Sequence, residues 1–301
     1  MTIENKDISR PVIVCHGGAG SNPDHVDGVQ QACAVGLKTM QQEGGGALDG
    51  VIAAAQVLED DVRFNAGTGS SLRLDGTSIQ MDASCMTDGG QFAAIAAIER
   101  VKNPIVIARH LLETPHVLLV GDGATAFARQ LGVKDYDPTT PGAQERLRKV
   151  VAAGGSYGEW TRTDLEKNWN YDMPLSEALG CDTIGSIAWD GQNFASALST
   201  GGTTTVLRGR VGDVPLPGCG LFVGKHGAVC LTGDGEHFVR SMLAYRGYAE
   251  LERGRSPEET VEWALGQVDE TVDIGVIVLN HNGFAGGARD RMAWHGQYAD
   301  L

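Results

Sequence analysis

The sequence predicts an α+β fold in which two mainly antiparallel sheets pack on each other beneath covering helices. Short apolar runs alternate with helical patterns along the chain, and turn signals such as Asp190-Gly191 join successive runs as hairpins. The strands fall into two groups, before and after a polar segment at residues 154–180. Because hairpins pair their strands antiparallel, a doubly wound parallel sheet is disfavoured.

Hydrophobic periodicity and turn residues define the elements of the first half. Asn103 and Pro104 provide a cap and a first-turn proline for one of its helices. We expect helices at 26–42, 47–58, 105–113, 123–131 and 143–152, and strands or β-rich stretches at 12–15, 72–86, 92–98 and 117–120.

The second half reads as three strand pairs and a capped helix. Residues 154–180 are polar with little periodicity, which predicts an exposed linker. The capping box that begins at Ser256 starts a helix that runs to residue 268. The strand pairs are expected at 183–189 with 193–199, 221–223 with 229–231, and 274–279 with the segment around Phe284.

Composition excludes several classes of protein. The chain has 301 residues and a formal charge of −14, without a Lys/Arg run, so neither nucleic acid nor a membrane surface is an expected partner. No stretch approaches the ~20 apolar residues of a membrane span. The polar start shows no secretory signal, and the six cysteines lack paired or zinc-ligand spacing. We therefore expect a cytoplasmic protein with free thiols.

The most informative segment is Gly180-Cys181-Asp182-Thr183-Ile184-Gly185, where a polar stretch runs directly into a threonine that opens a buried strand. Glycine-rich motifs surround it in the sequence. They are His16-Gly17-Gly18-Ala19-Gly20, Phe64-Asn65-Ala66-Gly67-Thr68-Gly69, Met81-Asp82-Ala83-Ser84, Lys102-Asn103-Pro104-Ile105, Ser199-Thr200-Gly201-Gly202, Gly209-Arg210-Val211-Gly212-Asp213 and Thr232-Gly233-Asp234-Gly235-Glu236.

In this order, these motifs resemble the plant-type L-asparaginase/isoaspartyl peptidase (type 2 asparaginase) family. Its members are N-terminal nucleophile (Ntn) hydrolases related to glycosylasparaginases. The resemblance implies an αββα sandwich and autocatalytic cleavage between Asp182 and Thr183. It also implies subunits of residues 1–182 and 183–301, intertwined in one structural domain, and a dimer of such αβ heterodimers.

The chemistry at Thr183 is consistent with this resemblance. A threonine hydroxyl needs a base, and cleavage would give Thr183 a free α-amine of unperturbed pKa about 7.7–8.0. Hydroxyl and amine of one residue would then act as nucleophile and base. The expected reaction hydrolyses β-aspartyl peptides and L-asparagine and releases L-aspartate.

The resemblance also assigns the remaining site residues. It implies that the Thr232 hydroxyl and the Gly233 N–H bind the oxyanion, and that Thr200 hydrogen-bonds the nucleophile. It further implies that Arg210 binds the substrate carboxylate, that Asp213 and Gly235 bind its ammonium, and that Asn65 lies near the cleavage site.

A structural sodium ion is implied as well, with no organic cofactor. Its ligands would be main-chain carbonyls, which leave almost no side-chain signature. The resemblance assigns them to Leu58, Glu59, Asp61, Phe64, Ala66 and Thr68.

Some residues depart from the family pattern. Cys181 replaces the usual histidine, and Thr203-Thr204-Thr205-Val206 replaces the usual M-T-N-K, which leaves the cleavage rate and the preferred leaving group open. Gly201 favours the asparaginase branch over glycosylasparaginases, which remain an alternative together with a non-catalytic small-ligand-binding member.

Structural roles are the alternatives for single residues. Thr183 could be an ordinary strand residue, and Arg210 with Asp213 a surface ion pair. We interpret His16 as a structural histidine in a tight turn, and Glu236 as a cap of a first helical turn.

Overall fold

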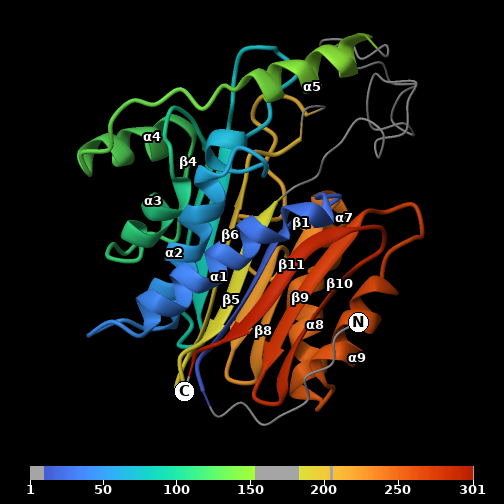
Figure 1. The fold of residues 1–301 in the computed structure, drawn as a ribbon. Coiled ribbons are helices and arrows are strands. Elements are labelled where there is room, and N and C mark those ends of the chain that lie inside the picture. The colour runs from blue at the N-terminus through green and yellow to red at the C-terminus, as the bar shows by residue number, and fades with distance from the viewer. Residues whose placement is uncertain (1–9, 153–182, 204–205, 301) are drawn as a thin grey trace.

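The structure is a computed structural model that describes residues 10–152, 183–203 and 206–300. It contains two sheets (Figure 1). The larger sheet is ordered β11 (Met292–Tyr298), β1 (Val12–Ala19), β5 (Ile184–Trp189), β6 (Phe194–Thr200), β2 (Met81–Thr87), β3 (Phe92–Ile98) and β4 (Leu118–Val120). The smaller is ordered β10 (Gly283–Ala288), β9 (Ile274–Asn280), β8 (Gly227–Gly233) and β7 (Leu221–Gly224). Within them, β3–β4 is a parallel pair and the other named pairs are antiparallel.

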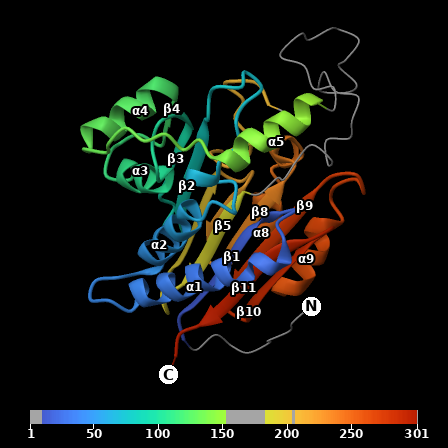
Figure 2. The same ribbon diagram turned by 45° about the horizontal axis from the view of Figure 1, so that its top comes forward.

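Helices cover the outer face of each sheet (Figures 1 and 2). Those on the larger sheet are α1 (Val26–Met40), α2 (Ala47–Asp60), α3 (Pro104–Leu111) and α4 (Gly121–Gln130). Those on the smaller sheet are α8 (Leu243–Glu252) and α9 (Pro257–Leu265). Among the described residues, the other helical segments are η1 (Pro23–His25), η2 (Gly67–Gly69), α5 (Pro141–Ala152) and α7 (Gly235–Ser241).

Three apolar layers explain why the strands are continuous hydrophobic runs. On β1, Ile13 and Cys15 pack toward α1 and α2, whereas Val12 and Val14 pack between the sheets. On β9, Ile277 joins the layer between the sheets and its neighbours join the layer under α8 and α9. Because both faces of each sheet are buried, alternate residues on both sides are apolar. The predicted αββα sandwich is therefore confirmed.

Most predicted elements match the structure, including the strand at 92–98 and the Asp190-Gly191 hairpin. The expected β-rich stretch at 72–86 is wrong over 72–80, because β2 begins only at Met81. The carboxylate of Asp75 there accepts the N–H groups of Thr77 and Ser78, and the left-handed Gly76 completes a tight turn. Backbone groups of this segment therefore bond within the turn and not in a strand ladder.

Two parts of the second half go beyond the prediction, which had only a first helical turn at Glu236. Residues 235–252 form α7 and α8, which are joined at Met242 in the left-handed conformation. Strand β11 pairs with β1, although its sequence M-A-W-H-G-Q-Y mixes polar residues and glycine into the run. Tertiary pairing, and not local pattern, forms this strand.

The predicted division of the chain at Thr183 stays a prediction. The linker at 154–180 and the predicted cleavage residue Asp182 lie outside the described residues. Strand β5, which follows Thr183, pairs with β1 from the first half on one side and with β6 on the other. In the part of the chain that the structure describes, no helix has the length and apolar character needed to cross a bilayer.

Candidate active site

Thr183 lies immediately before β5, is only 8% exposed, and faces Thr200 at the end of β6. Its Oγ1 donates a hydrogen bond to Thr200 Oγ1 at 3.1 Å, and Thr200 Oγ1 also accepts the N–H of Gly202 at 3.0 Å. The hairpin register, which pairs Ile184 with Ser199, brings the two hydroxyls together. The structure thus joins two of the predicted catalytic residues.

Thr232 is the second-last residue of β8 on the facing sheet and is fully buried. Its Oγ1 accepts the N–H of Ala19 at 3.0 Å, so the hydroxyl proton is left to be donated elsewhere. Ala19 ends β1, which runs antiparallel to β5 with His16 opposite Gly185. The end of β1 therefore lies at the same end of the sandwich as Thr183, and Thr232 lies there with it.

Gly233, the second predicted oxyanion residue, has a φ of 131°, in the region that favours glycine. A Cβ at this position would meet the carbonyl oxygen of Asp273 at 2.1 Å. The positive φ and the close approach to Asp273 both require glycine at this position. The backbone of residue 233 therefore has no side chain to cover it.

Asn65 is buried and bound to the segment that follows β6. Its Nδ2 donates to the carbonyl oxygen of Gly202, and its own carbonyl accepts the N–H of Gly201 at 2.8 Å. Its Oδ1 accepts the N–H of Ser71 at 2.9 Å. Asn65 therefore fixes the chain next to Thr200, at the same edge of the site.

Arg210 and Asp213 are close but do not form the surface ion pair that was the structural alternative for them. Arg210 instead binds Glu236 through both nitrogens of one edge, Nε to Oε1 at 2.8 Å and Nη2 to Oε2 at 2.7 Å. Burial acts on the pKa of Glu236 in the upward direction, but the two bonds from Arg210 hold it below its ordinary value. Glu236 lies in the first turn of α7, as predicted, yet its carboxylate binds this guanidinium.

Asp213 is a buried carboxylate whose Oδ2 has no hydrogen-bond partner among the described residues. Its two oxygens lie close to two glycine backbones. A Cβ added to Gly235 would lie 2.3 Å from Oδ1, and a Cβ added to Gly220 would lie 2.7 Å from Oδ2. Burial raises the pKa of Asp213 to about 7, against the opposing effect of Arg210. An unpaired buried carboxylate is costly, so this site is suited to a cationic ligand.

His16 is a further residue at the site, and its predicted location in a turn is wrong. It lies within β1, fully buried, with Nε2 at 3.4 Å from the Sγ of Cys230. Burial lowers the pKa of His16 to about 3, and a hydrogen bond with the backbone of Thr183 only partly opposes this. His16 is therefore a neutral, buried side chain that supports the backbone of Thr183.

The predicted sodium loop is tightly curled at the end of α2. A Cβ added to Gly67 would lie 2.4 Å from the carbonyl oxygen of Glu59. A Cβ added to Gly69 would lie 1.8 Å from the carbonyl oxygen of Phe64. These glycines let two of the predicted ligand carbonyls approach the turn closely. A main-chain alkali-ion site fits this loop but stays a prediction. Among the described residues, no group of three or more His, Cys, Asp or Glu side chains is placed to hold a metal.

Sequence reasoning missed the carboxylate of Glu59, which is fully buried behind the site. Its Oε1 accepts the hydroxyl of Ser199 at 2.6 Å and the N–H of Ile105 at 3.0 Å. It therefore ties the predicted sodium loop to the strand that carries Thr200. The signal available in the sequence was the position of Glu59 among the residues of α2 that are buried.

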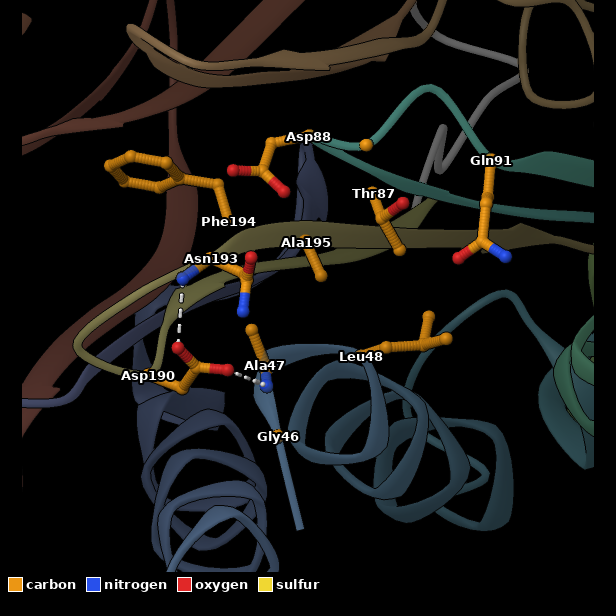
Figure 3. A pocket seen from close by; sticks show the side chains of 11 residues that line it. Gly46, Ala47, Leu48, Thr87, Asp88, Gln91, Asp190, Asn193, Phe194 and Ala195 are labelled. Atoms are coloured by element: carbon orange, nitrogen blue, oxygen red, sulfur yellow. Dashed lines mark hydrogen bonds between the residues drawn. The ribbon is translucent and has the colours of Figure 1, made fainter. Parts of the chain in front are cut away.

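A separate hollow of about 320 Å³ lies at the other end of β5 and β6 (Figure 3). Asp190 lies in its wall, and both of its carboxylate oxygens accept hydrogen bonds. Oδ2 accepts the N–H of Ala47 at 2.9 Å, and Oδ1 accepts the N–H of Asn193 at 2.8 Å. Because Asp190 and Thr183 flank opposite ends of a six-residue strand, about 20 Å separates this hollow from the two threonine hydroxyls.

The chain is similar to known proteins along most of its length. A family profile described as "Asparaginase" matches residues 9–299. The chain is 36% identical to a plant-type L-asparaginase of Pyrococcus furiosus over 92% of both chains. It is 38% identical to the isoaspartyl peptidase/L-asparaginase of Danio rerio over 91% of this chain and 87% of the relative. It is also 38% identical to the Xenopus laevis protein of that name, over 95% and 91%.

Proposed function

This chain belongs to the asparaginase family, and on that premise we propose that it is an amidohydrolase that releases L-aspartate from L-asparagine and from β-aspartyl (isoaspartyl) peptides. We propose Thr183 as its nucleophile, armed by self-cleavage of the Asp182–Thr183 bond. The observation that carries the proposal is the 3.1 Å hydrogen bond between the Thr183 and Thr200 hydroxyls, in a site that also contains Thr232.

The first step is attack of Thr183 Oγ1 on the substrate's side-chain carbonyl. The α-amine freed by cleavage takes the hydroxyl proton and passes it to the leaving amine. A β-aspartyl ester on Thr183 remains, and water hydrolyses it to L-aspartate. Thr200 contributes by orienting the attacking oxygen.

Developing negative charge on the carbonyl oxygen requires fixed donors. Thr232 supports this role because its oxygen already accepts the N–H of Ala19, which directs its proton away from that bond. Gly233 offers the adjacent backbone N–H from a conformation that only glycine adopts readily.

Substrate recognition uses the two charged residues of the 209–213 segment. Glu236 occupies one edge of the Arg210 guanidinium, which leaves the other edge for the substrate α-carboxylate. The unpartnered Oδ2 of Asp213 is suited to the α-ammonium. This pair of opposite charges selects a free amino acid end, which both substrate classes possess.

Assembly, ion and location are further parts of the proposal. We propose a dimer of αβ heterodimers in the cytoplasm, with a structural sodium ion on the carbonyls of the loop around Glu59 and Phe64. Such an ion would only shape the loop that contains Asn65, so the reaction needs no step through it.

A denaturing gel with intact mass spectrometry tests the function. The purified parent is expected to yield fragments that begin at Met1 and Thr183 and to hydrolyse L-asparagine and β-aspartyl-leucine. Thr183→Ala should stay uncut and inactive. Cleavage that persists in this variant would refute the nucleophile. A permanently single chain that binds aspartate without turnover would indicate a binding protein, and preference for a glycosylated asparagine would indicate a glycosylasparaginase.

A further inference from the structure

The segment that carries Arg210 and Asp213 is held from strand β2 and the residue before it. Gln80, Asp82 and Ser84 are alternate residues there, and Gln80 and Ser84 each bind a different position of the segment 209–214. The spacing of two places them along one side of an extended chain.

The first contact anchors the start of the segment. Gln80 Oε1 accepts the N–H of Gly209 at 2.6 Å, next to Arg210. The same side chain is held at its other end, since Gln80 Nε2 donates to Glu99 at 2.9 Å. An amide fixed at both ends gives Gly209 a single position.

The last contact anchors the other end. The hydroxyl of Ser84, which is fully buried, donates to the carbonyl oxygen of Val214 at 2.5 Å, next to Asp213. The two recognition residues therefore lie between two clamped backbone positions.

Asp82 acts at the centre of the segment. It is fully buried, and its Oδ1 accepts the N–H of Ala97 at 2.7 Å. Burial raises its pKa, while the charge of Arg73 and the backbone N–H of Gly212 both lower it. Asp82 is thus held from β3 through Oδ1, while its Oδ2 has no hydrogen-bond partner among the described residues.

Arg73 supplies the compensating charge for this buried carboxylate. It is fully buried, and its Nη2 donates to the carbonyl oxygen of Gln80 at 2.7 Å. Its Nη1 lies against Gly202, where a Cβ would stand at 1.9 Å. Arg73 thus touches both the segment after Thr200 and the residue that clamps Gly209.

We propose that Gln80 and Ser84 are positioning residues that set the spacing of Arg210 and Asp213, and thereby the affinity for the α-amino-carboxylate end of the substrate. The inference rests on the proposed function. Neither side chain touches the reacting atoms, so their effect falls on binding of L-aspartate and on KM, and not on self-cleavage at Thr183.

Isothermal titration of L-aspartate onto the purified full chain tests this. Gln80→Met keeps the side-chain length but removes the acceptor, and Ser84→Ala removes the donor. Each variant is expected to weaken aspartate binding about three- to tenfold, the usual effect of one lost hydrogen bond. KM should rise equally, while kcat and the extent of self-cleavage stay at the parent level. Gln42→Met, at an exposed glutamine far from the segment, is the matched control.

The outcomes separate the two proposals. Affinities within twofold of the parent in both variants would overturn the positioning role and leave the function intact. Loss of affinity together with lost self-cleavage would indicate general misfolding and would also overturn it. A parent that neither binds aspartate nor turns over substrate would overturn the proposed function, and this inference with it.

Discussion

Arg210 and Glu236 form a two-point ion pair through Nε and Nη2, and this pair fixes the plane of the guanidinium. We predict that Glu236→Gln raises KM for L-asparagine about three- to tenfold with little change in kcat, because Arg210 loses its orientation but stays charged. The expected rise in KM is modest because the Glu236 side chain is 42% exposed, and solvent screens its interaction with Arg210. Steady-state kinetics measures it, with Glu270→Gln at an exposed glutamate as control. An unchanged KM would contradict the orienting role.

The hydroxyl of Thr200 accepts from both Thr183 and Gly202. Thr200→Val keeps the shape but removes this acceptor, so kcat is predicted to fall on the order of 10- to 100-fold. Thr200→Ser restores the oxygen and should recover most of the rate. Equal rates in the two variants would exclude a role for the hydroxyl.

Asp213 should weaken the fold while serving the site. Its folded pKa of about 7 exceeds the unfolded value, so stability is full below about pH 4 and is lost as pH rises through 7. Asp213→Asn is therefore predicted to be more stable than the parent at pH 8, by on the order of 1–4 kcal/mol, and similar at pH 4. Thermal unfolding at both pH values measures this, and a lower midpoint at pH 8 would refute it.

The same carboxyl predicts a pH dependence of binding. Only ionised Asp213 pairs with an ammonium, so affinity for L-aspartate should be constant above pH 7 and fall about tenfold per pH unit below it. Calorimetry between pH 5 and 8 measures the slope. Asp213→Asn should bind weakly at every pH, and a pH slope that survives in this variant would assign the titration to another group.

Gly185 allows His16 to approach the start of β5. A Cβ there would meet His16 Nε2 at 2.4 Å and Cys230 Sγ at 2.5 Å, and both side chains are fully buried. We predict that Gly185→Ala lowers the free energy of unfolding by about 1–3 kcal/mol and slows self-cleavage. Thermal unfolding and a time course on denaturing gels measure both effects. Gly123→Ala, in α4 with no described atom within 4 Å of the new Cβ, is the control and should not destabilise the fold, because alanine is the better helix former.

The sandwich was predictable because burial of both sheet faces produces the apolar runs at the start of β1 and along β9. The capping box at Ser256 located α9 correctly, since local hydrogen bonds define it. Strand β11 could not be predicted, because its pairing with β1 joins residues about 280 positions apart. The 72–80 segment misled because apolar Leu72, Leu74 and Ile79 are buried by a turn and not by a strand.

The candidate site divides in the same way. Thr183, Thr200 and Thr232 were identified through local motifs, and the structure brings Thr183 into contact with Thr200. The partner of Arg210 was not predicted, because an ion pair across 26 residues leaves no local pattern. Three buried polar side chains near the site were also not predicted in these roles, namely those of Glu59, Gln80 and His16. Their partners are distant in the sequence, so only the folded chain shows them.

Because β5 lies between β1 and β6, its position determines how the protein behaves during purification once it is cut before Thr183. A nick before Thr183 would break one peptide bond and leave both ladders of hydrogen bonds around β5 in place. The two pieces would co-purify through a tag on either one and part only in denaturant. Expressed from separate genes, each would lack neighbours for its open strand edges, so only co-expression should give usable material.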